Sequence, residues 1–226
     1  MCAWRCMVAV LGLAVATVGG ANAAETYSYT VRHPTFGDIG TYTDRVEHDG
    51  DQWRIETTVH VAVRVLGVVV HREDARRVEV WRAGRLASFR GLTTTNGKPL
   101  EITGEARADG FAVTTSAGTT IAPVDVVPSD PWQAARTVTL PPTCVMLSTK
   151  TGRLASVAAS GGQTEQLSIH GAEIPVRHYV FRGARQQDVW IDAAGIPVRF
   201  RSVEGDVPID FELSREALAS RVAALK

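Results

Sequence analysis

The expected mature part of the sequence lacks a second cysteine, and this excludes an intrachain disulfide. Of the three cysteines, Cys2 and Cys6 lie in an N-terminal stretch that we expect to be removed, and only Cys144 remains. A disulfide needs two thiols within bonding distance, although an exported protein would be allowed one. The fold must therefore be held together by its apolar core alone.

The sequence also lacks an excess of charge of either sign. It has 24 Lys and Arg residues against 24 Asp and Glu residues. There is no basic run and no interleaving of basic with aromatic residues, so we expect no nucleic-acid partner. No apolar stretch after residue 23 is long enough to cross a bilayer, so we expect no transmembrane anchor once that segment is cleaved.

Signatures of catalysis and of cofactor binding are missing as well. The sequence has no Gly-x-Ser-x-Gly motif and no Gly-rich phosphate loop, and its six histidines have no ligand-like spacing. We therefore predict no metal site and no cofactor. Cys144 is a candidate nucleophile if His178 or His170 lies beside it, because a thiol needs a base to become reactive. The alternatives are a buried cysteine and a hydrogen-bonded core histidine. The balance favours a protein that is not an enzyme.

What the sequence does contain begins with an export signal. Arg5 supplies a positive charge, Met7–Val18 is a short apolar run, and Ala21–Ala23 forms a small-x-small cleavage site. The apolar run is too short to span a membrane as a helix. We predict cleavage after Ala23, a periplasmic or secreted location, and a single β-rich domain over residues 24–226.

The longest regular pattern runs from Trp53 to Val65, where apolar and polar residues alternate. This is typical of a β-strand with one buried face, and it would be about 43 Å long when straight. So long a strand must twist and coil, which favours a strongly curved sheet around an apolar concavity. Gly67 is followed by the apolar Val68–Val70, and it predicts a bulge or a sharp bend at this point.

Short alternating segments separated by turn sequences fill most of the remaining chain, which predicts an all-β fold. We expect one strongly curved antiparallel sheet, or an incomplete barrel, of about twelve strands. Residues 125–149 contain four prolines and predict a connecting loop with a short helix at Gln133–Val138. This loop is either a linker or a lid. Ser214 is a predicted N-cap for a C-terminal helix over residues 214–225.

Four motifs carry a resemblance to a known family: Gly37–Gly40, Val78–Leu86, Ser148–Gly152 and Val189–Val198. With the export signal they resemble the bacterial exported family called domain of unknown function 6134. A weaker similarity, chiefly in the hairpin that follows Trp190, is to the family called domain of unknown function 3108. The resemblance implies a periplasmic β protein and supplies no catalytic residue.

Three functions follow from these patterns. The first is non-enzymatic binding of a lipid-like or other hydrophobic molecule on the concave face of the sheet. The second is an envelope scaffold or accessory protein that binds another protein through a sheet edge. The third is a hydrolase that uses Cys144 or a carboxylate pair, which requires these groups to converge in a cleft.

Large aromatic side chains are the candidate contacts for a hydrophobic ligand, and packing of the core is their alternative role. The candidates are Trp53, Trp81, Phe89, Trp132, Tyr179 and Trp190.

Overall fold

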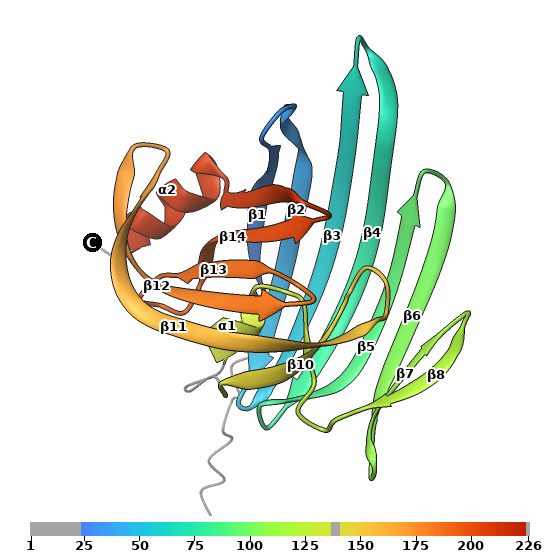
Figure 1. Ribbon diagram of the computed structural model, residues 1–226. Helices are drawn as coiled ribbons and strands as arrows, with labels where there is room; N and C mark the ends of the chain where they lie inside the picture. The colour runs from blue at the N-terminus through green and yellow to red at the C-terminus, as the bar shows by residue number, and fades with distance from the viewer. Residues whose placement is uncertain (1–23, 137–140, 225–226) are drawn as a thin grey trace, which may run out of the picture.

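The computed structural model describes residues 24–136 and 141–224, and the predicted signal peptide lies outside them. Fifteen strands form one continuous, strongly curved sheet (Figure 1), which confirms the predicted all-β class, although about twelve strands were predicted. The first strands are β1 (Glu25–His33), β2 (Gly37–Asp49), β3 (Gln52–Val65), β4 (Val68–Arg82), β5 (Arg85–Thr95), β6 (Lys98–Arg107), β7 (Gly110–Thr115) and β8 (Gly118–Ala122). The others are β9 (Val127–Pro128), β10 (Thr143–Leu147), β11 (Leu154–Ile169), β12 (Ala172–Gly183), β13 (Gln187–Ile191), β14 (Pro197–Glu204) and β15 (Val207–Leu213).

The sheet is built from two meanders that meet in its middle. Strands β1 to β8 follow one another on one side, and strands β15 back to β9 follow one another on the other. The two meanders join where β1 pairs with β15, with Tyr29 opposite Leu213. All neighbouring strands are antiparallel except β9 and β10, which are parallel. As a result β8 and β9, which are close in sequence, lie at opposite edges of the sheet.

The sheet curls until its two ends approach each other. Phe111 and Ala122 of β7 and β8 belong to the same core cluster as Val126 and Leu147 from the other end of the sheet. The two edge strands, β8 and β9, are not hydrogen-bonded to each other. We call this arrangement a half-open barrel, because side-chain packing closes it where backbone pairing does not.

Strand β3 shows why the alternating pattern predicts this sheet. Its odd-numbered residues Ile55, Thr57, Val59 and Val63 are all buried, and they face the interior of the half-open barrel. The predicted boundaries, Trp53–Val65, differ from the observed strand by one residue. Side chains that alternate along a strand point to opposite faces, so one apolar set is enough to fix the inward face.

The prediction at Gly67 was wrong in its geometry. Instead of a bulge within a continuing strand, Leu66 and Gly67 form a tight turn that reverses the chain between β3 and β4. Both residues have positive φ values, +50° and +82°, as a two-residue type I′ turn requires. A bulge lies nearby on β4, because Val63 pairs with His71 and Arg64 with Val69, which leaves Val70 as the extra residue.

The segment that predicts a connecting loop also contains regular structure. It holds β9, β10 and a short helix, α1 (Trp132–Arg136), where the sequence predicts a helix over 133–138. The Asp130 side chain accepts the backbone N–H of Trp132 at 2.6 Å, and Pro131 takes the first helical position, so the start of α1 is well capped. Trp132 is 1% exposed and packs against the ring of Tyr27.

The predicted C-terminal helix is confirmed as α2 (Arg215–Ala224). The hydroxyl oxygen of Ser214 accepts the backbone N–H of Ala217 at 3.3 Å, as the predicted N-cap requires. Leu218 is buried in the larger of two hydrophobic clusters, which also contains Tyr29 and Phe200 and which we call the main core. No helix in the described part of the chain is long and apolar enough to cross a membrane.

Aromatic rings fill the middle of the half-open barrel. Tyr29, Tyr42 and Phe200 lie within 5.1–5.8 Å of one another between ring centroids, and Phe211 lies 5.5 Å from Tyr42 and stacks on Phe200 at 4.3 Å. Such contacts between rings stabilise a core beyond the burial of their area. A cavity lies next to this aromatic layer, and Phe211 borders it.

Candidate functional site

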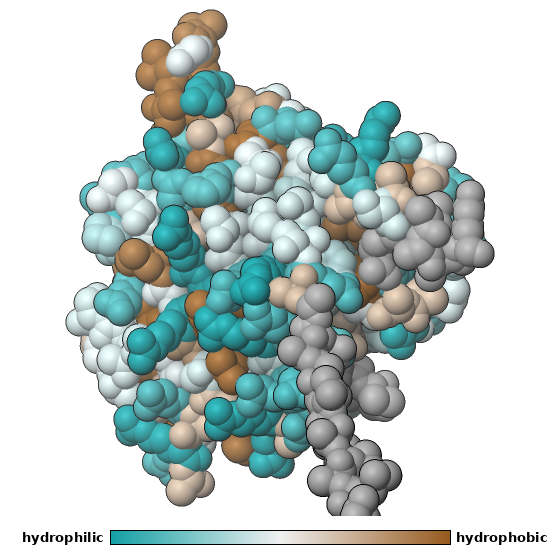
Figure 2. Space-filling model, turned by 180° about the vertical axis from the view of Figure 1, so that it is seen from behind, coloured by the Kyte–Doolittle hydropathy of each residue, from teal (hydrophilic) through white to brown (hydrophobic). Residues whose placement is uncertain are grey.

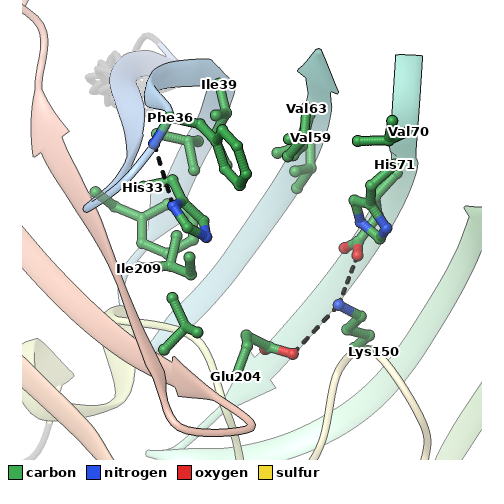
Figure 3. A pocket seen from close by; sticks show the side chains of 15 residues that line it. His33, Phe36, Ile39, Val59, Val63, Val70, His71, Lys150, Glu204 and Ile209 are labelled. Carbon is green, nitrogen blue, oxygen red and sulfur yellow. Dashed lines mark hydrogen bonds and ion pairs between the residues drawn. The ribbon is translucent and has the colours of Figure 1, made fainter. Parts of the chain in front are cut away.

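A cavity of about 440 Å³, which we call the main cavity, opens at the end of the barrel beside the β1–β2 and β3–β4 turns (Figure 3). Most of its walls are aliphatic, and they come from β1 to β4 and from β15: Val31, Ile39, Val59, Val63, Val70 and Ile209. Its volume lies within the range of about 300–1,000 Å³ that is usual for small-molecule sites.

Phe36 stands at the mouth of the main cavity, in the turn between β1 and β2 (Figure 3). Its side chain is 45% exposed, and its ring lies 4.7 Å from the ring of His33. The Nδ1 atom of His33 accepts the backbone N–H of Thr35 at 3.0 Å, which fixes the turn. The mouth is therefore formed by a large apolar ring on a short, hydrogen-bonded turn.

The floor of the main cavity is charged. Lys150, from the loop between β10 and β11, places its Nζ atom 2.6 Å from Glu73 Oε2 and 3.3 Å from Glu204 Oε2 (Figure 3). Burial alone would lower the pKa of the Lys150 ammonium, but the two carboxylates more than offset this and raise it. Lys150 is therefore charged at neutral pH, and the site combines an aliphatic wall with a fixed cation.

A smaller space of about 70 Å³, the inner cavity, lies against this floor and shares Glu73, Lys150 and Glu204 with the main cavity. It is lined by two further cations, Arg77 and Arg185. With them, the two cavities have three basic groups against two acidic ones.

The two arginines, Arg77 and Arg185, differ in their hydrogen-bond partners. Arg185 donates a hydrogen bond to Ser148 Oγ at 2.8 Å, and burial lowers the pKa of its guanidinium. Arg77 is 8% exposed, and its nearest nitrogen lies 4.0 Å from Glu73 Oε1. Its Nε atom is buried and has no hydrogen-bond partner among the described residues. A buried donor left unpaired costs about 1–3 kcal/mol.

Behind the inner cavity lies a buried acid, Asp44. Its carboxylate accepts hydrogen bonds from Thr57 Oγ1 at 2.6 Å and from Trp132 Nε1 at 2.8 Å. Burial raises the pKa of Asp44 to about 7, more than these hydrogen bonds lower it. Burial likewise raises the pKa of the neighbouring Tyr42 well above its ordinary value. Asp44 thus gains or loses a proton near neutral pH inside the core.

The six aromatic residues that the sequence offers as ligand contacts do not line the main cavity. Trp81 and Phe89 belong to the separate core under β4 to β7, whereas Trp132 and Tyr179 belong to the main core. Trp53 stacks on His48 at 5.0 Å, and Trp190 stacks on His178 at 4.4 Å. Their contact with a ligand stays a prediction.

The two candidate catalytic residues occupy different places. Cys144 borders a separate cavity of about 260 Å³, where burial and then the nearby Asp125 raise the pKa of its thiol. His178 lies on β12, hydrogen-bonded to Asp188 Oδ1 at 3.0 Å. A raised thiol pKa leaves little of the reactive thiolate at neutral pH. Within the described ranges, no group of three or more His, Cys, Asp or Glu residues is placed to hold a metal ion.

The charged residues of the two cavities were not identified from the sequence. Three of them, Lys150, Arg185 and Glu204, come from turns or strand ends that converge only in the folded chain. Lys150 does lie within the motif Ser148–Gly152 that carries the family resemblance. That motif was a usable signal, because a lysine in a turn between two strands can reach a neighbouring surface.

Comparison with known proteins gives a family but no function. A family described as "Domain of unknown function (DUF6134)" matches residues 37–214. No curated protein matches the sequence. A solved structure of a beta-barrel-like protein of the domain of unknown function DUF1849 from Brucella abortus has a TM-score of 0.61 at 9% identity. That match covers 84% of this chain and 95% of the other, and it supports the barrel-like fold alone.

A second solved structure, of a DUF1089 family protein from Pseudomonas aeruginosa, has a TM-score of 0.41 at 10% identity. It covers 86% of this chain and 95% of the other chain.

Proposed function

Because this chain belongs to the DUF6134 family, whose function is unknown, we propose its function from the cavity: it binds an amphiphilic molecule with an apolar chain and an anionic head. The observation that carries this proposal is the junction of the main cavity, with its aliphatic walls, and the charged floor at Lys150. The sequence offers hydrophobic-ligand binding as one of three functions, and this site favours it over the other two.

The apolar chain of the ligand would lie among the valines and isoleucines of the main cavity. Burying apolar surface contributes about 25 cal/mol per Å², so a chain that is mostly enclosed gains several kcal/mol. The aromatic layer formed by Tyr42, Phe200 and Phe211 limits how far the chain can enter. The site therefore suits a single chain better than a bulky multi-chain lipid.

The anionic head would lie at the charged floor and reach the inner cavity. Arg77, Lys150 and Arg185 line the inner cavity and supply positive charge there. Hydrogen bonds between a guanidinium and a carboxylate or phosphate are about twice as strong as neutral ones. The two cavities together have three basic residues against the two acidic residues Glu73 and Glu204, and this excess of one positive charge favours an anion over a cation.

We further propose that this binding takes place outside the cytoplasm, in the periplasm or beyond the cell, because the sequence predicts a signal peptide. The first experiment is native mass spectrometry of the mature protein, purified gently from its own periplasm. A discrete adduct that solvent extraction releases as an acidic amphiphile supports the proposal. A clean mass of the unliganded chain, without uptake of a fluorescent fatty acid, contradicts it.

Filling the main cavity should abolish uptake of the fatty acid. We expect Val61→Trp to weaken binding of a fluorescent fatty acid by at least tenfold, because the larger side chain occupies the space of the ligand. Leu92→Trp is the matched control, since Leu92 is 49% exposed on β5 and does not line the cavity. Fluorescence titration measures both, and equal affinities for the two variants would contradict the proposed site.

The head group is tested with two ligands that share one chain length. A fatty acid should bind roughly tenfold more tightly than the corresponding fatty alcohol, because only the acid offers a charged acceptor to Arg77 and Lys150. Competition against the fluorescent probe gives both affinities. An alcohol that binds as tightly as the acid would leave the apolar part of the proposal standing and remove the anionic head.

A further inference from the structure

The β3–β4 hairpin ends in an exposed apolar segment, Val65–Val70, which we call the apolar tip. Leu66 is fully exposed, and the four valines of the tip are 41–65% exposed. Figure 2 shows the tip as a brown projection above the otherwise mixed surface, at the place where the β3–β4 hairpin rises above its neighbours in Figure 1. A contiguous exposed apolar group of this kind marks an interaction site more often than a folding requirement.

The apolar tip stands free of the rest of the sheet. The pairing of β2 with β3 ends at Val61, and the pairing of β5 with β4 begins at Glu73. Residues 62–71 are therefore paired only within their own hairpin, whereas the backbone of Arg72 is also bonded to Asn96. Four residues of β3 beyond Val61 extend about 13 Å past the neighbouring strand. The valines of the tip gain little from the core at this distance.

The turn itself is not optimised for folding. Leu66 has φ +50° followed by Gly67 at +82°, and the β5–β6 turn has nearly the same angles, +49° and +80°, at Asn96 and Gly97. Asn adopts this left-handed conformation readily, whereas a leucine is strained there. Ala83 and His170 take similar positive φ values before a glycine, +48° and +51°, so several turns of this chain share the conformation. What distinguishes the turn at Leu66 is a large apolar side chain that is fully exposed.

The exposed cations beside the apolar tip are Arg64 and Lys98. Arg64 lies next to the tip, and no acidic residue lies between Val61 and Arg72 in the sequence. Arg72 is paired with Asp74 at 2.7 Å, so it adds no free charge. Lys98 lies on the adjacent β5–β6 hairpin, which Asn96 ties to the backbone of Arg72 by a 2.8 Å hydrogen bond. Apolar residues next to an arginine and a lysine match an anionic lipid surface, where acyl chains lie beneath negatively charged head groups.

We infer that the apolar tip docks this protein onto an anionic lipid bilayer. Leu66 and the adjacent valines enter the boundary between head groups and acyl chains, and Arg64 and Lys98 contact lipid phosphates. The depth is limited, because the outer backbone groups of a free two-stranded ribbon need water or head groups as partners. Val70 belongs both to the tip and to the wall of the main cavity, so docking turns the mouth of that cavity toward the bilayer.

The test is co-sedimentation of the mature protein with vesicles of phosphatidylcholine in which phosphatidylglycerol replaces about a quarter of the lipid. The wild-type protein should sediment with these vesicles, and less with pure phosphatidylcholine. Leu66→Asn should weaken binding about tenfold and Arg64→Gln about fivefold. Leu92→Asn is the matched control, because it removes an equally apolar side chain from the solvent face of β5.

Two outcomes overturn the inference. Wild-type protein that stays in the supernatant with both kinds of vesicle leaves a protein partner as the occupant of the tip. Equal binding by wild type and Leu66→Asn removes the tip as the docking element. Thermal melting separates docking from folding, because Leu66→Asn relieves the strained turn and should leave the melting temperature unchanged or higher. The vesicles contain no free fatty acid, so failure here does not affect the proposed cavity function.

Discussion

Replacing Asp44 with Asn is expected to remove most of the pH dependence of folding stability between about pH 4 and pH 7. The pKa of Asp44 is about 7 in the folded protein and 3.8 ordinarily, so the folded state binds a proton that the unfolded state releases. A raised pKa contributes stability that is complete below pH 3.8 and is lost as the pH rises through 7. The shift corresponds to at most about 4 kcal/mol.

Asn reproduces the protonated acid without titrating. Its oxygen can accept from Trp132 Nε1, and its amide can donate to the hydroxyl of Thr57, so both buried partners stay satisfied. Urea unfolding at several pH values, followed by tryptophan fluorescence, measures the effect. Relative to the wild type, we expect the free energy of unfolding of the variant to increase by several kcal/mol as the pH rises from 4 to 8.

Asp210→Asn is the opposite control for this experiment. Burial alone would raise the pKa of Asp210, but hydrogen bonds from Arg201 and Arg199 lower it below its ordinary value. A lowered pKa contributes stability at neutral pH that is lost as the pH falls below about 4. The Asp210→Asn variant should therefore lose most stability, relative to the wild type, at neutral pH.

For Asp44 itself, parallel stability–pH profiles of the wild type and Asp44→Asn would contradict the prediction, because they would show that Asp44 is ionised throughout.

Removing the cation of the charged floor is expected to cost about 2–3 kcal/mol of stability. Lys150→Met keeps the length of the side chain and removes its charge, which leaves the carboxylate of Glu73 buried at 11% exposure. Arg77, at 4.0 Å, is then its nearest cation. A buried charge that loses its close partner is destabilised far more than a surface charge.

A double-mutant cycle tests this explanation. Glu73→Gln should rescue much of the loss in Lys150→Met, because the second change removes the orphaned charge. Arg54→Met is the surface control, since Arg54 and its partner Glu56 are 42% and 37% exposed, and it should cost less than about 1 kcal/mol. Urea unfolding measures all variants. Strictly additive losses at positions 73 and 150 would mean that the two side chains do not interact.

The sequence predicts the sheet well wherever one face of a strand is uniformly apolar. In β3, Ile55, Val59 and Val63 share a face, and the structure buries all three. Ser214 and Leu218 likewise predict the start and the packed face of α2. In these segments local pattern and tertiary packing agree, so the pattern alone identifies the buried side.

Strand β4 shows where alternation fails. Its outward residues include Val78 and Val80, while its buried residues include the charged Glu73, Arg77 and Glu79. Alternation alone would place the valines inside. Glu73 is buried with a counter-ion from another segment, because Lys150 lies far along the chain from it. Partners that meet only in the folded state leave no local pattern.

The turn at Leu66 and the role of the aromatic residues are hard to predict from the sequence for related reasons. Leucine is rare at a positive φ, so the pattern around Gly67 favours a bulge over a reversal. Large rings are favoured both in ligand sites and in cores, and composition cannot distinguish the two roles. In this fold the rings occupy the core, and the main cavity is lined mostly by aliphatic side chains.

The pairing of β1 with β15 also determines when the protein can finish folding. Within each meander, neighbouring strands other than β9 and β10 are joined by short connections, so each half can form local hairpins as soon as it is synthesised. The seam between Tyr29 and Leu213 joins the first strand to the last. Until β15 emerges, the edge of β1 is an unpaired template, open to other chains as well as to its own. The last strand of the chain therefore completes the barrel and closes its most aggregation-prone edge in the same step.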